Sequence, residues 1–426
     1  MMHNDEIETQ PSCEDELNSG LLSVDEARER MLDAVSTIRD TRTAALRAAL
    51  GQVLAADVVS PIDVPAYTNS AMDGYAVRSA DLPADGTRTF LVAGTSWAGR
   101  PYIGPIGPGE AVRIMTGGMM PEGMDSVIMQ EQVEIDAHNN SVRIGTGHTA
   151  GQNVRAAGED VQAGQTVLSA GRRLTAADIG VLASLGLGKV TVYRKLRVAF
   201  FSTGDELRAV GEPLCPGEIH DSNRYSIYGL LKKLDVDSID LGVIRDDPVL
   251  IEAAFREAAA RADVVLTSGG VSVGEADFVK DTLEKIGTLS FWKIAMKPGR
   301  PVTFGHINEA VFLGLPGNPV SVMVTFFQFV RPVLLKMSGD NGPSAVFTLR
   351  ATTTTRLKKR PGRYEFQRGL LQQTGPGEFT VGSIGAQGSG ILRSMSEANC
   401  FILLEPEQSA VDAGAEVLVQ PFQNLI

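Results

Sequence analysis

The stretch ADVVLTSGGVSVGEADFVK, residues 262–280, decides how the chain around it is organised. The apolar run from Val264 to Leu266 is typical of a buried strand, and the loop after it carries almost no side-chain bulk. Backbone N–H groups of such a loop can approach an anion closely, and the dipole of a following helix favours negative charge. Glu275 and Asp277 follow the glycines, which suits a divalent cation beside a phosphate. The stretch matches no common nucleotide motif, and taken alone an ordinary strand-to-helix turn explains it equally well.

Strands and helices alternate on both sides of this stretch. Strands are predicted at 198–201 and 239–244, each followed by a helix, and 264–266 is the third strand of the series. This spacing predicts a central, doubly wound parallel α/β domain with right-handed crossovers. Ligands of such sheets bind beyond the carboxyl ends of the strands. Since the loop after each of the three strands is acidic or rich in glycine, we expect the loops to line one crevice.

Acidic side chains gather in these loops, at Glu206, Asp246, Asp247, Glu275 and Asp277. Oxygen ligands without a histidine favour Mg²⁺ over a transition metal. Helix capping is the alternative, and it explains Asp246 and Asp247 about equally well because a proline follows them. Five acids at neighbouring strand ends exceed what capping requires, so a Mg²⁺ site is predicted.

Positive charge is predicted at the same crevice by Lys297 and Arg300 of the turn KPGRP. Beside an anion-binding loop they would be counter-charges for an oxyanion, although solvated surface charge is the more common role of such residues. The sequence has no Gly-x-Ser-x-Gly motif and no Cys/His pair, and its five histidines are scattered. The residues alone therefore indicate a Mg²⁺-assisted enzyme that acts on a phosphorylated or other oxyanionic ligand.

The rest of the chain divides into further predicted parts. Residues 1–20 are acidic and aperiodic, which is typical of a disordered tail. A capping box at Ser23 and Glu26 predicts one helix, and Thr175 begins another. We expect four ordered domains: a mixed α/β domain at 21–55 with 151–194, an inserted β-rich domain at 56–150, the α/β domain at 195–340, and a small β-barrel-like domain at 341–426.

Composition limits the class of protein. The chain has 426 residues, of which 43% are hydrophobic and 21% charged, as in soluble proteins of several domains. A net charge of −12 argues against nucleic-acid binding, and three distant cysteines indicate a reducing compartment. The N-terminus lacks a secretory signal, and the apolar run Val320–Leu335 is too short and too polar to span a membrane. We therefore expect a cytoplasmic protein that binds neither nucleic acid nor membranes.

A series of motifs resembles the molybdopterin molybdenumtransferase family, whose animal relative forms the C-terminal half of gephyrin. In order they are NSAMDGYAV (69–77), RIMTGG (113–118), GQNVRAAGED (151–160), STGDEL (202–207), HDSNR (220–224), IRDDP (244–248), SGGVSVGEAD (268–277), MKPGRP (296–301) and LPGNPVS (315–321). The resemblance covers roughly residues 21–422. It implies a transferase that inserts molybdate into adenylylated molybdopterin with Mg²⁺-dependent release of AMP. It also implies a homodimer with an elongated N-terminal part and a cleft completed across the interface.

The resemblance also implies a role for individual residues. Mg²⁺ or the pyrophosphate region would be held by Glu206, Asp246 and Asp277. The pterin phosphate or the adenylate would be cradled by Asp221, Ser268, Gly269 and Gly270, and Thr203, Ser272, Gly274, Pro316 and Pro319 complete the implied substrate-binding set. Molybdate would be received by Lys297, Arg300, Arg368 and Ser389. The partner subunit would supply Asp73, Thr116 and Asp160, and the implied catalytic residues are Asp73, Glu206, Asp246 and Asp277. Arg300 departs from the motif, where lysine is usual, but a guanidinium also binds oxyanions.

Three alternatives stay open at this point. The related molybdopterin adenylyltransferase shares the Ser-Gly-Gly loop but is about one domain long, and the β-rich segments 56–170 and 345–426 argue against it. A tungsten-inserting relative would look the same, because tungstate and molybdate are close in size and charge. A non-catalytic scaffold would not need the acidic set or the two cations. The resemblance further implies a transient contact with the adenylyltransferase that delivers the substrate.

Overall fold

The computed structural model describes residues 21–269, 278–342 and 346–422. The chain forms two compact units. The first consists of residues up to Arg42, the short segment 51–53 and residues from Val192 onward, and the second of 43–50 and 54–191. The predicted disordered tail, residues 1–20, lies outside the described residues.

A six-stranded sheet organises the first unit, in the order β16-β13-β17-β21-β20-β18. Its strands are β13 (Arg197–Thr203), β16 (Asp237–Ile244), β17 (Val264–Ser268), β18 (Thr288–Lys293), β20 (Pro301–Ile307) and β21 (Ala310–Leu315). The pairs among β16, β13, β17 and β21 are parallel, whereas β20 runs in the opposite direction and pairs antiparallel with both β21 and β18. The predicted α/β sheet is thus confirmed, with an antiparallel edge in addition.

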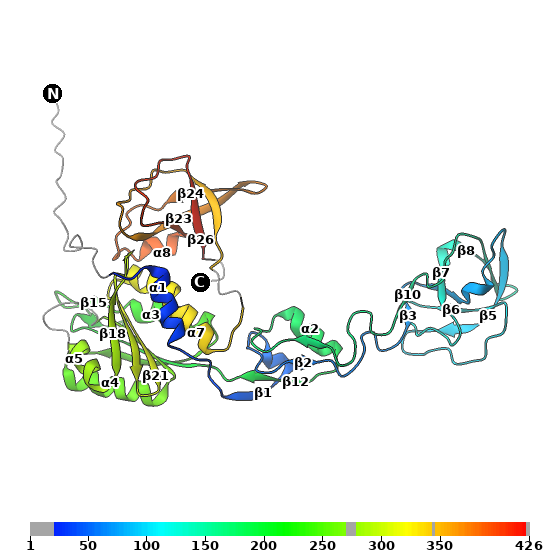
Figure 1. The fold of residues 1–426 in the computed structure, drawn as a ribbon, viewed down its shortest axis with the longest axis horizontal. Coiled ribbons are helices and arrows are strands. Elements are labelled where there is room, and N and C mark those ends of the chain that lie inside the picture. Colours follow the sequence, from blue (N-terminus) through cyan, green and yellow to red (C-terminus); the bar gives the residue numbers. More distant parts are fainter. Residues whose placement is uncertain (1–20, 270–277, 343–345, 423–426) are drawn as a thin grey trace, which may run out of the picture. The chain divides into compact units, whose positions relative to one another are not determined.

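Helices cover both faces of this sheet, as expected for a doubly wound domain (Figure 1). One face carries α1 (Val24–Asp33), α3 (Asn223–Lys233), α6 (Pro319–Thr325), the π-helical turn η4 (Phe326–Val330) and α7 (Arg331–Met337). The other carries α4 (Pro248–Arg261) and α5 (Phe278–Ile286). Side chains alternate along β13, so Phe200 joins the first core and Phe201 the second. In that second core the rings of Phe201 and Phe255 pack edge to face, 5.1 Å apart.

Residues Pro319–Met337 form one 19-residue helical stretch that is long and apolar enough to cross a membrane by length and composition. The prediction that this run is too short and too polar was therefore wrong. Within it, 78% of the most apolar window is buried inside the protein, so the predicted buried core helix is confirmed. Pro319 occupies the first turn of α6, where its missing N–H has no partner to lose.

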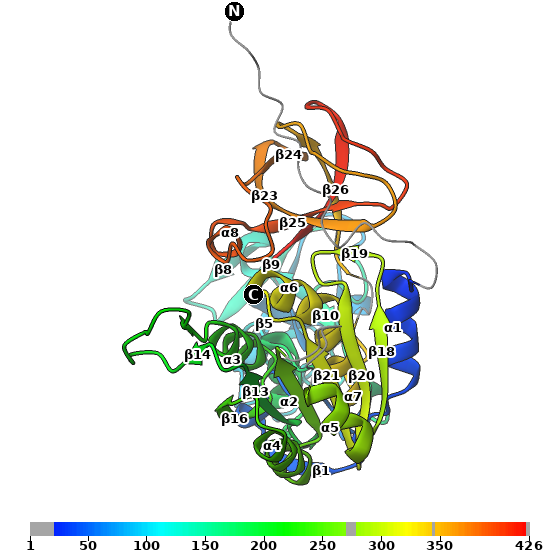
Figure 2. The same ribbon diagram turned by 90° about the vertical axis from the view of Figure 1, so that its left-hand side faces the viewer.

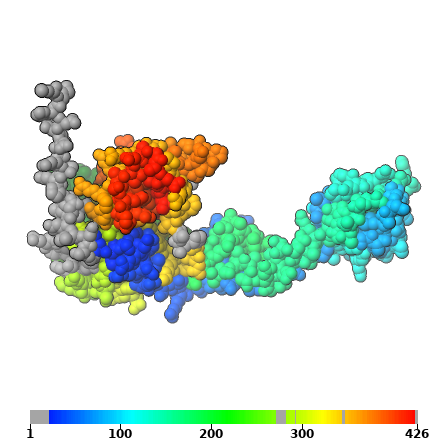
Figure 3. Space-filling view, turned by 45° about the horizontal axis from the view of Figure 1, so that its top comes forward, coloured from blue at the N-terminus to red at the C-terminus, as the bar shows by residue number. Residues whose placement is uncertain are grey.

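The C-terminal part of the first unit is a closed five-stranded barrel, as predicted. Its strands are β22 (Leu349–Thr353), β23 (Tyr364–Gly375), β24 (Glu378–Ser383), β25 (Cys400–Leu404) and β26 (Glu416–Pro421), with the short helix α8 (Arg393–Glu397) beside β23. Figures 2 and 3 show the barrel packed against the α/β domain. The rings of Phe401 and Phe422 in this contact lie 4.7 Å apart, and β19 (Met296–Lys297) extends the barrel sheet by pairing with β23.

The second unit is rich in short strands. Its six-stranded sheet, ordered β7-β4-β6-β5-β9-β8, contains β4 (Gly74–Val77), β5 (Arg88–Ser96), β6 (Glu110–Ile114), β7 (Ser126–Met129), β8 (Val133–Asp136) and β9 (Ser141–Ile144). Two-stranded pairs join β2 (Val58–Val59) to β11 (Thr166–Leu168) and β3 (Asn69–Ser70) to β10 (Val154–Arg155). The paired strands β1 (Thr41–Ala45) and β12 (Lys189–Tyr193) carry the chain from one unit to the other.

The helix starts predicted from capping residues are found where expected. Ser23 caps α1 by accepting a hydrogen bond from the Glu26 amide, but the predicted capping box is only half formed, because the Glu26 carboxylate pairs with Arg30 instead of the N-cap amide. Thr175 and Asp178 form a reciprocal capping box at α2 (Ala176–Ser184). The segment after β1 is the short 3-10 helix η1 (Leu46–Ala49).

Candidate functional site

The crevice at the carboxyl ends of β13 and β17 lies at the switch point of the sheet. From β13 the chain crosses to β16 on one side, and β17 is followed outward by β21 on the other. Ligands of open α/β sheets bind at such a point. Ser202 and Ser268, at these two strand ends, are paired in register. The predicted location of the site at these strand ends therefore agrees with the topology.

Gly269 keeps the end of β17 free of side-chain bulk. Its φ is +92°, and a Cβ atom at this position would lie 2.6 Å from the carbonyl oxygen of Thr203. Its amide donates to the carbonyl of Leu315, 3.3 Å away. The hydroxyl of Thr203 is buried, and no hydrogen-bond partner for it is present among the described residues. Only glycine fits here, which leaves the backbone and two hydroxyls, those of Thr203 and Ser268, beside the crevice.

Asn223, the first residue of α3, joins three parts of the crevice. Its side-chain amide donates to the Ser268 hydroxyl oxygen and to the Gly317 carbonyl, each at 2.7 Å. Gly317 belongs to the turn before α6, between Pro316 and Pro319. Sequence reasoning missed Asn223, although the motif HDSNR contains it.

Asp221 is buried just before α3 and is engaged by the protein itself. Its carboxylate accepts hydrogen bonds from the Arg224 backbone amide at 3.2 Å and from Arg224 Nε at 3.3 Å. Arg224 also pairs with Asp240 of β16 at 3.1 Å. These contacts fix the start of α3 and thereby the position of Asn223.

The loops that carry Asp205 and Asp246 are joined where β13 and β16 end, and Glu206 is the residue after Asp205. The Asp205 amide donates to the Asp246 carboxylate and the Asp246 amide to the Asp205 carboxylate, each at 3.3 Å. Partial desolvation, together with the negative charges of Asp205 and Glu206, raises the pKa of Asp246. Asp205 was missed by sequence reasoning. Asp247 is instead the N-cap of α4 and accepts from the amides of the next turn, so for this residue the capping alternative was right.

Mg²⁺ fits the chemistry of this group. None of the three carboxylates forms an ion pair with a lysine or arginine in the described part of the chain, and like charges held together favour a cation between them. Mg²⁺ prefers oxygen ligands and keeps several waters, so a few carboxylates suffice. Within residues 21–269, 278–342 and 346–422, no three acidic, histidine or cysteine side chains form a ligand set by themselves. The predicted residues Gly270, Ser272, Gly274, Glu275 and Asp277 lie outside the described residues.

Of the predicted molybdate-binding residues, Ser389 contacts α6, and Arg300 follows a residue that packs on the same helix. The amide of Val320 donates to the carbonyl of Ser389 at 3.0 Å. Gly299, next to Arg300, is packed so closely that a Cβ would lie 2.8 Å from the Thr325 hydroxyl of α6. Lys297 is exposed on β19, paired in register with Glu365 of β23.

Arg368 of β23 is fully buried in the barrel wall. It donates from Nε to the Ser394 hydroxyl and from Nη2 to the Gly388 carbonyl, both at 3.1 Å. No carboxylate pairs with it among the described residues, and burial lowers its pKa to about 10. A buried guanidinium without a counter-charge is costly, and an anionic ligand would offset that cost.

Two of the three residues predicted to come from a partner subunit lie together in the second unit. The Asp73 carboxylate accepts hydrogen bonds from the amide and the hydroxyl of Thr116, each at 2.7 Å. These bonds lower the pKa of Asp73, which keeps it ionised. Asp160 is exposed on the segment after β10, which pairs with β3 just before Asp73.

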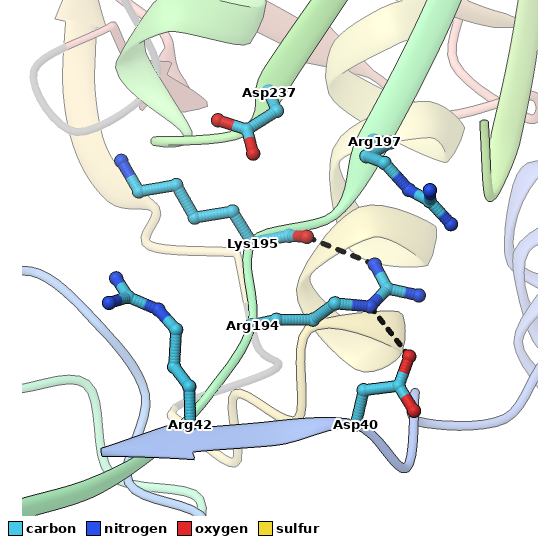
Figure 4. A pocket seen from close by; sticks show the side chains of 6 residues that line it. All are labelled: Asp40, Arg42, Arg194, Lys195, Arg197 and Asp237. Atoms are coloured by element: carbon cyan, nitrogen blue, oxygen red, sulfur yellow. Dashed lines mark hydrogen bonds and ion pairs between the residues drawn. The ribbon is translucent and has the colours of Figure 1, made fainter. Parts of the chain in front are cut away.

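A pocket of about 610 Å³ lies at the opposite end of the strands from the crevice, where β13 and β16 begin (Figure 4). Its lining is Asp40, Arg42, Arg194, Lys195, Arg197 and Asp237. Arg194 donates to Asp40 at 2.8 Å and to both oxygens of Asp263 at 2.7 and 2.8 Å. Arg197 also pairs with Asp263, and Lys195 with Asp235. Because the charges largely balance, this cluster is an anchor for the chain segments that meet here.

Family models match three consecutive regions of the chain. The "MoeA N-terminal region (domain I and II)" matches residues 22–186, the "Probable molybdopterin binding domain" residues 199–336, and the "MoeA C-terminal region (domain IV)" residues 350–422. The crevice residues of the first unit fall in the second and third of these regions.

Named relatives and a solved structure match over most of the chain. A molybdopterin molybdenumtransferase of Haemophilus influenzae is 46% identical over 406 residues, which is 95% of this chain and 100% of that protein. Gephyrin of Dictyostelium discoideum is 31% identical over 94% of this chain and 62% of its own length. A crystal structure of a molybdopterin biosynthesis MoeA protein from Pyrococcus horikoshii is 31% identical, with a TM-score of 0.82 over 94% of this chain and 100% of that chain.

Proposed function

Because the chain belongs to the molybdopterin molybdenumtransferase family, we propose that its crevice binds adenylylated molybdopterin and molybdate, inserts the metal and releases AMP. The observation that carries this proposal is Arg368, a buried guanidinium that no carboxylate of the described chain neutralises. A tetrahedral dianion such as molybdate supplies the missing charge and accepts several hydrogen bonds. Arg300, whose neighbour Gly299 packs on α6, and the Ser389 loop, which contacts α6 at Val320, are proposed as further donors for the same anion.

The phosphate groups of the substrate are assigned to the switch point. Gly269 lets a ligand approach the backbone, and the hydroxyls of Thr203 and Ser268 have no acceptor among the described residues. Backbone and hydroxyl donors of this kind bind phosphate oxygens without a strict charge requirement. This arrangement supports binding of the pterin phosphate or of the adenylate beside Asn223 and Gly317.

Glu206, Asp205 and Asp246 would hold Mg²⁺, with Asp277 completing the set predicted from the motifs. When bound, Mg²⁺ neutralises charge that develops on phosphate oxygens as AMP leaves. The carboxylates themselves orient the bound ion through the paired loops that join Asp205 to Asp246. The donors are oxygens alone, which favours Mg²⁺ over metals that prefer imidazole or thiolate ligands.

The active site is further proposed to be shared between two copies of the chain. Asp73, Thr116 and Asp160 of one subunit would complete the crevice of the other, and the hydrogen bonds from Thr116 would keep the Asp73 carboxylate oriented for that role. We also propose a cytoplasmic location and a transient contact with the adenylyltransferase that forms the substrate. Neither nucleic acid nor membrane is a proposed partner.

AMP release tests this function directly. Purified protein is incubated with adenylylated molybdopterin and Mg²⁺, with and without molybdate, and AMP and pterin-bound molybdenum are measured. The proposal expects release that depends on molybdate, with molybdenum retained on the pterin, and a parallel series with tungstate measures metal preference. A folded dimer that binds molybdopterin but releases no AMP under either condition would favour a non-catalytic binding protein instead.

A further inference from the structure

The end of β17 contains a hydrogen-bond arrangement that fixes the direction of one proton. Ser268 is 2% exposed, and its hydroxyl oxygen accepts a hydrogen bond from the Asn223 side-chain amide at 2.7 Å. A hydroxyl that accepts along one direction must point its own proton elsewhere. No acceptor for that proton is present among the described residues. The Ser268 hydroxyl is therefore a donor directed away from Asn223 and without an acceptor in the described part of the chain.

The side-chain amide nitrogen of Asn223 uses both of its protons in hydrogen bonds, whereas its carbonyl oxygen accepts none from the described residues. Both protons of its amide are used, since the same nitrogen also lies 2.7 Å from the Gly317 carbonyl, which can only accept. This contact settles which terminal atom is nitrogen. The side-chain carbonyl oxygen is buried and has no hydrogen-bond partner within the described residues. An unpaired buried acceptor of this kind is expensive unless a ligand or water donates to it.

The neighbouring groups define what ligand would satisfy both atoms. The Thr203 hydroxyl is also buried with no partner among the described residues, and it lies beside Gly269, where a Cβ would be only 3.3 Å from that hydroxyl. A bare glycine with hydroxyl donors next to it suits the oxygens of a phosphate. An acceptor close by suits an N–H or O–H group on the same molecule. Such a ligand is a phosphate ester that carries a hydrogen-bond donor near the phosphate.

We propose that Asn223 is a positioning residue that directs the Ser268 hydroxyl proton at a phosphate oxygen of the substrate, while its own carbonyl oxygen accepts a hydrogen bond from the same molecule. Both the pterin phosphate and the adenylate have this chemistry, through ring N–H groups in one case and ribose hydroxyls in the other. The inference rests on the proposed function, because it assigns the ligand of the crevice to the substrate of the transferase. Asn223 thereby acts on binding through Ser268.

A double-mutant cycle in the full-length protein tests this role. Binding of molybdopterin under anaerobic conditions and binding of AMP are each measured by calorimetry for Asn223→Ala, Ser268→Ala and the double variant. Ser268→Ala is expected to weaken the binding of one of the two probes by roughly 10-fold, the loss of one hydrogen bond to a charged group, and Asn223→Ala by more, because its own carbonyl acceptor is lost as well. The double variant should bind no worse than Asn223→Ala, because the loss of Asn223 already removes the directed hydrogen bond of Ser268. The probe that responds identifies which phosphate is held.

The variant Asn223→Asp distinguishes a role of Asn223 in positioning the Ser268 proton from a purely structural role in joining Ser268 to Gly317. A carboxylate at this position accepts from Ser268, which turns the serine proton away from the ligand and adds a repelling charge. This variant should therefore bind on the order of 100-fold more weakly, a larger loss than for Asn223→Ala. A brace between Ser268 and Gly317 would instead lower the unfolding temperature and the molybdate affinity of both variants together. Ser222→Ala, on an exposed neighbour whose side chain makes no capping bond, is the matched control.

Two results would overturn the inference. One is unchanged binding of both probes by Asn223→Ala, and the other is additive losses in the double variant. Should Asn223→Ala not fold, Asn223→Asp keeps the side-chain size, and binding by it as tight as that of Ser268→Ala would also count against the inference. Wild-type protein that binds molybdopterin but releases no AMP would contradict the proposed function and leave the role of Asn223 in binding testable by the same cycle.

Discussion

The carboxylate of Asp73 accepts two hydrogen bonds from Thr116, one from the backbone amide and one from the hydroxyl, each 2.7 Å long. They connect the loop before β4 to the turn after β6 and lower the pKa of Asp73. A lowered pKa means that the two hydrogen bonds stabilise the ionised form of Asp73 in the folded protein. Its contribution is present above the ordinary pKa of an aspartate and is lost as the pH falls through the lowered value. At neutral pH Asp73 is therefore a fixed negative charge.

Asp73→Asn should lower kcat by about 100-fold or more while the protein remains folded, because it removes this charge from the proposed shared active site. Asp136→Asn is the matched control. Asp136 also accepts from a backbone amide and a side chain, both of Asn139, at an exposed turn of the same unit, and its pKa is also lowered. Equal losses in AMP release by the two variants would contradict a specific role for Asp73.

Mixed dimers test whether the site is shared between subunits. Asp73→Asn and Asp246→Asn subunits, each inactive alone, should recover about a quarter of wild-type activity after random exchange at equal amounts, because half of the dimers regain one intact site. The measurement is AMP release before and after subunit exchange. No recovery, with exchange verified by differently tagged subunits, would place Asp73 and Asp246 in the same subunit's site or remove one of them from catalysis.

The raised pKa of Asp246 predicts that the stability of the protein depends on pH and on Mg²⁺. A raised pKa means that the folded protein favours the protonated carboxyl group more than the unfolded chain does. Stability from this group is full below the ordinary aspartate value and is lost as the pH rises through the raised one. At neutral pH Mg²⁺ should offset that loss and raise the unfolding temperature of the wild type. Asp246→Asn should unfold at the same or a higher temperature without Mg²⁺, show no Mg²⁺ response and lose at least about 100-fold in kcat.

Asp247→Asn is the control for this experiment, since asparagine caps a helix about as well as aspartate. It should keep both the Mg²⁺ response and the activity. The assignment of the metal would fail if Asp246→Asn retained the wild-type dependence of AMP release on Mg²⁺ concentration.

The crevice could be predicted from the sequence because strand ends and the loops that follow them are set by neighbouring residues. Apolar runs with bare or acidic loops, as at Ser268 and Gly269, follow from periodicity and turn chemistry alone. The reversed direction of β20, which makes its pairs with β18 and β21 antiparallel, could not be read in this way, because an apolar strand has the same pattern in either direction.

Contacts between distant segments explain what sequence reasoning missed. Asn223 lies 45 residues from Ser268 and 94 from Gly317, and only the folded sheet brings them together. Asp205 was passed over for the same reason, since its partner Asp246 follows another strand. Arg368 was predicted only by resemblance, and its burial without a carboxylate depends on the closed barrel.

Arg368→Met should weaken molybdate binding by about 100-fold, because it removes a charge-assisted donor. The protein should be as stable as the wild type or more so, because an apolar side chain of similar length replaces a buried, uncompensated charge. Unfolding temperatures with increasing molybdate, and with sulfate for comparison, measure both effects. Arg350→Met, at an exposed arginine of β22 paired with Glu416, should leave the molybdate response unchanged. A full molybdate response in Arg368→Met would contradict the proposed anion site.

Gly269→Ala tests the bare backbone at the switch point. The methyl group would lie 2.6 Å from the Thr203 carbonyl oxygen at a φ of +92°, so steric overlap adds to the left-handed backbone strain. The α/β domain should lose about 3 kcal/mol of unfolding free energy, and molybdopterin binding should fall with it. Chemical denaturation and calorimetry measure the two effects.

Gly414→Ala isolates the backbone term in this comparison. Gly414 has a φ of +90° and no atom within 4 Å of the position of an added Cβ, so its replacement should cost only about 1 kcal/mol. The difference between the two variants is then the steric cost of the contact between Gly269 and Thr203. Equal losses in both would mean that the end of β17 can shift away from β13, and the close approach at the switch point would not be a fixed feature of the substrate site.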